Sequence, residues 1–171
     1  MTVETVFRAP SVDDGAAIWR LVKATGRLDL NSAYLYLLLA KHFADTCVVA
    51  VHGERLVGFA SGYRPPSQPD TIFLWQIGVD PTVQGQGLGR RLLRAFMHSP
   101  GARGVRWLET TISPDNTASQ ALFRGFAHDL GIECIVGECF RAEQFPGGGH
   151  EAEQLYRIGP LGSADPNRFF A

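Results

Sequence analysis

The sequence lacks most of the features that mark secreted and metal-binding proteins. Three of its 171 residues are cysteine, and Cys47, Cys134 and Cys139 form neither a CxxC pair nor a cysteine–histidine metal spacing. An odd number of cysteines argues against a disulfide framework and favours reduced thiols in the cytoplasm. Because the cysteines lack a metal-binding spacing, we expect no bound metal ion.

Long apolar runs are also missing. No run approaches the roughly 20 residues that a membrane-spanning helix needs. Residues 1–8 do not show the basic and then apolar order of a secretion signal. We therefore expect a cytoplasmic protein with no membrane partner.

Neither sign of charge is in excess. The chain has 16 lysine and arginine residues against 17 aspartate and glutamate residues, so we expect no nucleic-acid partner. Hydrophobic residues make up 45% of the chain, which is enough for one globular core. We predict a single domain over residues 1–158. Residues 159–171 have no periodic pattern, and we predict a tail there that lies on the surface or is disordered.

The sequence does contain short apolar runs in alternation with amphipathic segments. Strands are predicted at residues 5–8, 47–51, 56–61, 72–79, 105–112, 134–136 and 155–158. Helices are predicted from the capping box Ser11-x-x-Asp14 to about Gly26, from Asn31 or Ser32 to about Phe43, from Leu88 to Met97, and from Thr117 to Phe126. This order predicts a mixed α/β fold whose first half is rich in hairpins.

One segment joins a buried strand to a helix through a glycine-rich turn, Gln84–Gly89. Free backbone N–H groups and the positive end of the helix dipole meet at such a turn, and both favour a phosphate group. The spacing fits neither the G-x-G-x-x-G of dinucleotide-binding folds nor a P-loop, which needs Lys-Ser/Thr where Arg90 and Arg91 stand. Taken alone, the turn leaves phosphate binding and a simple glycine turn equally open.

Two motifs together resemble those of the GCN5-related N-acetyltransferases. They are Gln84-x-x-Gly87-x-Gly89 after Ile77-Gly-Val-Asp-Pro, and Asn116-x-x-Ser119-x-x-Leu122-Phe123-x-Gly125-Phe126. The resemblance implies that family's fold, a central, mostly antiparallel sheet with a splayed parallel pair, flanked by helices. It also implies acetyl-CoA as cosubstrate, held by Ile77, Gly78, Val79, Gln84, Gly85, Gln86, Gly87, Leu88, Gly89, Arg90 and Asn116. Arg90 and Arg91 can contact the adenosine phosphates or belong to a solvated helix face, and the two alternatives stay equally open.

Further segments resemble a branch of that family which acetylates a small diamino acid. They are Leu28–Tyr36, Phe73–Asp80, Leu108–Ile112 and His150–Arg157, and the resemblance covers about residues 7–158. It implies transfer of acetyl to the 4-amino group of L-2,4-diaminobutyrate, on the way to the compatible solute ectoine. It also implies a homodimer.

The chemistry of such a transfer asks for acidic groups. An amine with a pKa near ~10 is protonated at pH 7, and its deprotonation costs about 4 kcal/mol, so the site needs a proton acceptor. An α-ammonium group also calls for carboxylates. We take Glu109, Asp29 and Tyr34 as candidate catalytic residues. Candidate substrate-binding residues are Asp29, Asn31, Tyr36, Trp75, Glu109, Thr111, His150 and Glu153.

Each candidate has a structural alternative. Glu109 can be an outward strand residue, Asp29 a charge at a helix start, and His150 a loop residue. Trp75, Tyr34 and Tyr36 can belong to the core. Arg27 can pair with the α-carboxylate of a substrate or lie on the surface.

The sequence departs from the family pattern at Phe123, where many members carry the tyrosine that protonates the leaving thiolate. Phenylalanine cannot donate a proton, so either water or another hydroxyl serves, those of Tyr34 and Tyr36 included, or the thiolate leaves unprotonated. The backbone N–H of Val79 is the candidate donor to the oxyanion. Two other hypotheses stay open: an acetyltransferase of the same fold for another small amine or diamino acid, and a non-catalytic acyl-CoA sensor.

Overall fold

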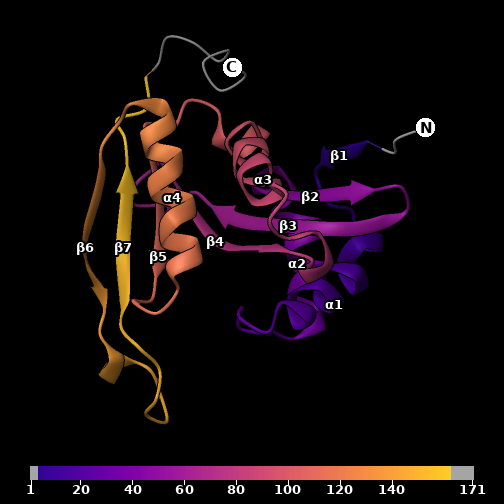
Figure 1. Cartoon of the computed structure of the whole chain (residues 1–171), viewed down its shortest axis with the longest axis horizontal. Coiled ribbons are helices and arrows are strands. Elements are labelled where there is room, and N and C mark those ends of the chain that lie inside the picture. The colour runs from indigo at the N-terminus through magenta and orange to yellow at the C-terminus, as the bar shows by residue number, and fades with distance from the viewer. Residues whose placement is uncertain (1–3, 163–171) are drawn as a thin grey trace. The chain divides into compact units, whose positions relative to one another are not determined.

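The computed structural model describes residues 4–162 (Figure 1). These residues divide into two compact units. Unit 1 contains residues 4–64 and 74–103, and unit 2 contains residues 65–73 and 104–162. The described residues form seven β-strands and four α-helices, with the strands in the order β1-β2-β3-β4-β5-β7-β6. Neighbouring strands pair antiparallel in β1–β2, β2–β3, β5–β7 and β6–β7, and in parallel in β4–β5. The predicted mixed α/β fold with a mostly antiparallel sheet is confirmed.

Unit 1 is a twisted sheet with helices on both faces. It contains β1 (Thr5–Arg8), β2 (Cys47–His52), β3 (Arg55–Tyr63), most of β4 (Thr71–Val79), α1 (Gly15–Thr25), α2 (Ala33–His42) and α3 (Leu88–Met97). In Figure 1, α1 and α2 lie on one face of β2 and β3, and α3 lies on the other. The alternation of β3 explains this arrangement. Phe59 packs among residues of α1 and α2, whereas a Cβ on its neighbour Gly58 would lie 3.2 Å from Leu92 of α3.

The two N-terminal helices begin and end where the sequence predicts. The Asp14 carboxylate accepts the Ser11 N–H at 2.7 Å before α1, and Gly26 ends that helix with a positive φ of 62°. The Ser32 hydroxyl accepts the Leu35 N–H at 3.4 Å and caps α2. These caps fix the length of the loop that joins α1 to α2.

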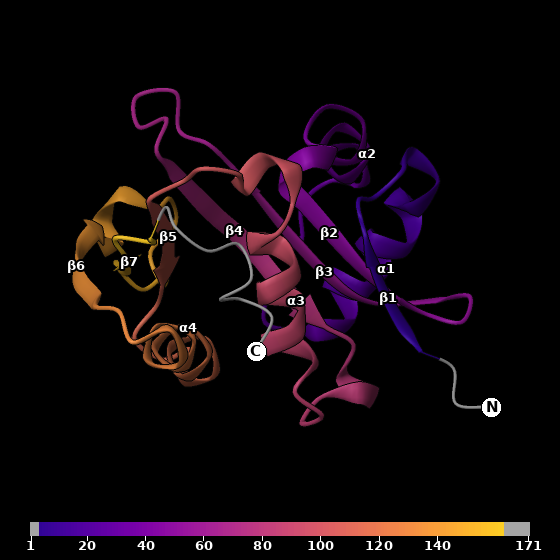
Figure 2. The same cartoon turned by 90° about the horizontal axis from the view of Figure 1, so that it is seen from above.

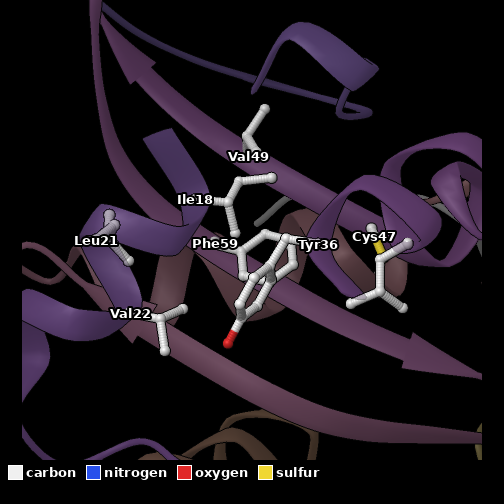
Figure 3. Close-up of a cluster of buried hydrophobic side chains, with 8 residues drawn as sticks. Ile18, Leu21, Val22, Tyr36, Cys47, Val49 and Phe59 are labelled. Carbon is white, nitrogen blue, oxygen red and sulfur yellow. The ribbon is translucent and has the colours of Figure 1, made fainter. Parts of the chain in front are cut away.

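A buried cluster holds α1 and α2 on the sheet. It contains Ile18, Leu21, Val22, Tyr36, Leu39, Cys47, Val49 and Phe59. Figure 3 shows the ring of Tyr36 against the ring of Phe59, in an edge-to-face arrangement with the ring centroids 6.1 Å apart. Tyr36 is 0% exposed, so it is a core residue of unit 1.

Unit 2 contains the start of β4, β5 (Trp107–Ile112), α4 (Thr117–Leu130), β6 (Cys134–Phe140) and β7 (Glu153–Ile158). Figure 2 shows β7 between β5 and β6 with α4 beside them. The parallel ladder joins Thr71, Ile72 and Phe73 of β4 to Trp107, Leu108 and Glu109 of β5. The Arg124 guanidinium of α4 lies 5.3 Å from the centre of the Tyr156 ring of β7. The face of β7 that carries Tyr156 is therefore the one that α4 covers.

Four predicted boundaries in unit 2 are wrong: the end of α4, the start of β5, the end of β6 and the start of β7. Helix α4 does not end at Phe126 but continues to Leu130, where Gly131 ends it with a φ of 64°. Strand β5 begins at Trp107 rather than at residue 105. Strands β6 and β7 are longer than predicted because they pair antiparallel from Cys134↔Ile158 to Phe140↔Glu153. A pairing partner extends strands that their own apolar pattern marks only in part.

The chain continues past residue 158 in an ordered form. Leu161 is 7% exposed, and its N–H donates to the Arg106 carbonyl at 2.7 Å. The rest of the predicted tail, residues 163–171, lies outside the described residues.

Candidate functional site

In unit 1, β4 runs into the glycine turn through a segment that is fixed by its own side chains. The Asp80 carboxylate accepts the Thr82 N–H at 2.9 Å and the Thr82 hydroxyl at 2.7 Å. Arg55 donates to the other carboxylate oxygen at 2.6 Å. Burial alone would raise the pKa of Asp80, but the hydrogen bonds from Thr82 and Arg55 outweigh it and lower that pKa. Asp80 therefore stays ionised at neutral pH and caps the segment that leads into the turn.

The turn itself is exposed and needs glycine at two positions. Gly85 and Gly87 have φ values of 78° and 72°, a region that side chains with a Cβ disfavour. Gln84 donates from Nε2 to the Val79 carbonyl at 3.1 Å. Helix α3 begins at Leu88, and by helix geometry its first N–H groups have no acceptor inside the helix. The turn and these N–H groups form the cradle, which we define as Gln84 to Arg90.

Neither packing nor backbone conformation requires glycine at position 89 of the cradle. It has helical dihedrals, and a Cβ there would meet only Val79 Cγ2, at 3.9 Å. Glycine in a helix costs about 0.5–1 kcal/mol relative to alanine, so a glycine that packing does not require points to close approach of a ligand. The dipole and the free N–H groups at this helix end suit a phosphate.

The strand before the cradle has two unlike faces. Leu74, Gln76 and Gly78 are buried, whereas Ile77 and Val79 are half-buried and Trp75 is 41% exposed. The predicted alternative of Trp75 as a core residue is therefore wrong. A strand face with an exposed indole is available to a ligand.

The loop between α1 and α2 and the first turn of α2 carry four of the predicted acceptor-side residues. Asp29 is exposed, and within the described part of the chain its carboxylate has no hydrogen bond or ion pair. Tyr34, on the first turn of α2, is 67% exposed. Asn31 is half-buried and donates from Nδ2 to the Asp29 carbonyl at 3.2 Å. Tyr36 differs from these three, since it is fully buried and its hydroxyl donates to Gln76 Oε1 at 3.3 Å.

In unit 2, Glu109 lies in the middle of a charged and aromatic cluster. It is 7% exposed and forms a close ion pair through Oε1 with Arg157, its cross-strand neighbour on β7. The Arg157 guanidinium also lies 4.1 Å from the centre of the Trp107 ring. Thr111 follows two residues later on the same face of β5 and is half-buried. The outward, solvated alternative for Glu109 is therefore wrong.

Burial raises the pKa of the nearby Cys139 thiol, and the carboxylates of Glu109 and Glu153 raise it further. Cys139 lies at the bulge where β6 pairs with the start of β7. The electrostatic effect shows that Glu109 and Glu153 act on the same region of unit 2.

The remaining predicted residues of unit 2 lie around the start of α4 and the β6–β7 connection. Asn116 caps α4, since its Oδ1 accepts the Ser119 N–H at 3.1 Å. His150 stacks on Phe145 with the ring centroids 3.8 Å apart, and its Nδ1 lies 2.6 Å from the Glu151 carbonyl. Phe123 is 1% exposed, so the departure from the family pattern is a core residue of α4.

The sequence reasoning missed three residues that fix these groups: Asp80, Gln76 and Arg157. Asp80 and Gln76 are polar residues in or next to the apolar β4 segment, and that contrast was the available signal for both. Arg157 alternates with Tyr156 and Ile158 on β7, but its partner is 48 positions away in sequence. Only the pairing of β5 with β7 could reveal it.

Among residues 4–162, no helix is long and apolar enough to cross a membrane. Within the same residues, no group of three or more histidine, cysteine, aspartate or glutamate side chains could hold a metal ion.

Comparison with known proteins defines the class first. The model of the acetyltransferase (GNAT) family matches residues 16–127, which include β4, the cradle and most of α4. Members of this class use acetyl-CoA as cosubstrate, and the cradle is the part of this fold that suits its phosphates.

Relatives of high sequence identity identify the family within this class. The chain is 48% identical over 152 residues to an L-2,4-diaminobutyric acid acetyltransferase of Halalkalibacterium halodurans, covering 89% of this chain and 80% of that protein. It is 50% identical over 160 residues to the protein of that name from Chromohalobacter salexigens, covering 92% and 83%. This chain belongs to the family of the L-2,4-diaminobutyric acid acetyltransferases.

A solved structure agrees with this result. Diaminobutyrate acetyltransferase EctA from Paenibacillus lautus, in complex with its substrate L-2,4-diaminobutyric acid and coenzyme A, superimposes with a TM-score of 0.89. The two chains are 44% identical, and the match covers 92% of this chain and 96% of the other. The fold predicted from the two motifs is thereby confirmed.

Proposed function

We propose that this chain transfers the acetyl group of acetyl-CoA to the 4-amino group of L-2,4-diaminobutyrate, as a step in the synthesis of ectoine. The observation that carries the proposal is the likeness to the EctA complex, at 44% identity over nearly the whole of both chains. The product is N4-acetyl-L-2,4-diaminobutyrate.

The cradle of unit 1 receives coenzyme A in this proposal. Its pyrophosphate binds the N–H groups of the residues from Gln84 to Arg90, where Gly89 leaves room for close approach. The pantetheine arm pairs with the backbone of Ile77, Gly78 and Val79 at the end of β4. Asn116 of unit 2 acts either on the cofactor or by ordering the turn that it caps.

The reaction itself is attack of a neutral amine on the thioester carbonyl. The C–N bond forms, the carbonyl oxygen becomes an oxyanion, and the C–S bond then breaks to release the CoA thiolate. The Asp80 N–H donates to Val57 of β3 at 2.9 Å. Since neighbouring N–H groups of a strand point to opposite edges, the Val79 N–H points away from β3, which supports its role as oxyanion donor.

The acidic residues serve the acceptor, which carries two ammonium groups and one carboxylate. Asp29 has an exposed carboxylate that can bind an ammonium group or accept its proton. Glu109 and Glu153 add negative charge in unit 2, although Arg157 compensates part of that of Glu109. The other proposed acceptor contacts are Asn31, Tyr34 and Trp75 in unit 1, and Thr111 and His150 in unit 2. Arg27 is the candidate partner of the substrate's α-carboxylate.

Tyr34 is the side chain best suited to protonate the leaving thiolate in place of Phe123, because its hydroxyl lies on an exposed ring. Tyr36 stays a predicted substrate contact, but its burial favours an indirect role.

A thiol-release assay tests the proposal. We expect acetyl-CoA to be consumed with L-2,4-diaminobutyrate, with a kcat/KM at least about tenfold above those of ornithine and putrescine. Ornithine is one methylene longer, and putrescine lacks the α-carboxylate. Equal rates with all three would favour a general amine acetyltransferase of the same fold.

The non-catalytic alternative makes a different prediction. In an acyl-CoA sensor, Asp29→Ala and Glu109→Ala would leave acetyl-CoA binding intact and change nothing else that can be measured. No CoA release with any of the three amines, together with tight acetyl-CoA binding by calorimetry, would support that alternative.

We also propose a cytoplasmic homodimer that uses the outer edge of β6. This strand ends the sheet of unit 2, and its Ile135 and Phe140 are each 47% exposed. An open edge with exposed apolar side chains is suited to strand pairing across a two-fold axis. Light scattering should give twice the chain mass, and Ile135→Lys should lower it towards the mass of one chain.

A further inference from the structure

Gln76 is a buried polar residue in the middle of an apolar strand, and the proposed chemistry does not use it. It is 3% exposed, and its neighbours on the same face of β4 are the buried Leu74 and Gly78. A buried amide costs free energy unless its donor and acceptor are both satisfied. The partners of Gln76 therefore indicate what it does.

Both partners lead to the loop between α1 and α2. Gln76 donates from Nε2 to the backbone carbonyl of Asp29 at 2.8 Å, and its Oε1 accepts the Tyr36 hydroxyl at 3.3 Å. The Tyr36 hydroxyl oxygen also accepts the backbone N–H of Asn31 at 3.5 Å. Asn31 closes the arrangement, since its Nδ2 donates to the Asp29 carbonyl at 3.2 Å.

The loop is also held by packing on the same face of β4. A Cβ on Gly78 would lie 2.9 Å from Leu28 Cδ1 and 3.3 Å from Thr25 Cγ2, so glycine lets this loop rest directly on the strand. The Tyr36 ring is itself fixed against Phe59 in the core. The loop is thus attached to β4 at two points, Gln76 and Gly78, on either side of Ile77.

We infer that Gln76, with Tyr36, is a positioning residue that sets the place of the Asp29 carboxylate relative to the end of β4. The inference deepens the proposed function and rests on it, since it takes Asp29 as a contact of the acceptor. Val79, the proposed oxyanion donor, is three residues further along the same strand, about 10 Å away. One strand therefore carries the proposed donor to the acetyl oxygen and the attachment of the acceptor loop.

The size of the effect follows from this geometry. Loss of the Gln76 bonds frees the Asp29 backbone without removing the carboxylate. A displacement of about 1 Å at a reacting group can cost about 100-fold in rate. Among residues 4–162, the Gln76 side chain forms no hydrogen bond with a residue of the cradle. Acetyl-CoA binding should therefore be unaffected.

The test compares Gln76→Leu, Tyr36→Phe and the wild type. Gln76→Leu removes both bonds and keeps an apolar side chain of similar size, so we expect the KM for diaminobutyrate to rise about 10-fold, less than the loss expected when the Asp29 charge itself is removed. Tyr36→Phe leaves the bond to Asp29 and should raise it less. The acetyl-CoA dissociation constant, measured by calorimetry, should be unchanged in both. Leu74→Val is the matched control, because it trims the same buried face of β4 and keeps both Gln76 bonds.

A second measurement does not depend on turnover. Hydrogen exchange of the backbone N–H groups of residues 28–31 should be faster in Gln76→Leu than in the wild type and in Leu74→Val. Faster exchange with an unchanged KM would overturn the positioning role, and so would unchanged exchange. A wild-type chain that releases no CoA with diaminobutyrate would instead refute the proposed function.

Discussion

Two carboxylates that the sequence places in the same role lie in opposite surroundings. Asp29 of unit 1 is exposed and its backbone is fixed, but its carboxylate is unpaired within the described residues. Glu109 of unit 2 is buried and forms an ion pair with Arg157, whose guanidinium lies over the Trp107 ring. The fold thus leaves one carboxylate ready for an external cation and satisfies the other from within.

The difference extends to the rest of each unit. Unit 1 contains residues that its own packing does not require. Trp75 is exposed, and packing does not require glycine at position 89. In the described part of unit 2, Glu109, Asn116 and His150 all have partners inside the protein. We expect substitutions in the first group to weaken ligand binding without a loss of stability, and those in the second to lower stability as well.

The largest effect should come from breaking the ion pair. Arg157→Met removes the charge but keeps an apolar chain over Trp107, and it leaves Glu109 buried without a counter-charge. We expect the free energy of unfolding to fall by about 3 kcal/mol, measured by urea denaturation at pH 7. Arg106→Met, which removes an exposed charge near β5, is the control and should change stability by less than about 0.5 kcal/mol.

A double substitution then isolates the buried charge. Arg157→Met combined with Glu109→Gln should recover a large part of the lost stability, because the neutral amide does not need a counter-charge. If the double variant is less stable than Arg157→Met, the ion pair is not the source of the loss.

A somewhat smaller effect, on activity alone, should follow from Asp29→Asn. The amide keeps the size of the side chain but loses the charge-assisted contact with an ammonium group, which is worth about 2 kcal/mol. We expect kcat/KM for diaminobutyrate to fall about 30-fold in the thiol-release assay, an amount that corresponds to that energy. The urea midpoint should not move, and a clear shift would show that Asp29 supports the fold rather than the substrate.

A third substitution should have effects of opposite sign on stability and binding. Gly89→Ala places a Cβ where only Val79 lies within 4 Å. The unliganded protein should gain about 0.5–1 kcal/mol, since alanine is the better helix former. Acetyl-CoA should bind more weakly by calorimetry. Unchanged affinity would mean that no ligand approaches the cradle at this residue.

The smallest effect concerns the thiols of the two units. Burial raises the pKa of Cys47 in unit 1 to about 12, so almost no thiolate is present at pH 8. Cys139 in unit 2 is exposed and should react first with an alkylating reagent, whereas Cys47 should react only after unfolding. Because the Glu153 carboxylate raises the pKa of Cys139, Glu153→Gln should lower it and speed the labelling of Cys139 at pH 8. Mass spectrometry of timed samples would measure both rates.

Local structure could be predicted where neighbouring residues decide it. The caps at Ser11, Gly26 and Ser32 and the glycine turn act within a few positions, so the sequence was sufficient to place α1, α2 and the cradle. Cross-strand pairing is not local. For that reason the lengths of β6 and β7 and the ion pair of Glu109 with Arg157 were missed.

The cradle, Asp29 and the family resemblance were determined by the sequence itself, since they depend on residue types at fixed spacings. Only the tertiary structure decided which predicted residues are exposed to a ligand and which are used by the core. Tyr34 and Tyr36 are two positions apart on one helix, yet one is 67% exposed and the other is buried, because α2 packs a single face on β3. The bond from Gln76 to Asp29 spans 47 positions, and no pattern along the chain marks it. Burial and long-range pairing arise from the packing of whole elements, and this is why they are absent from the local sequence.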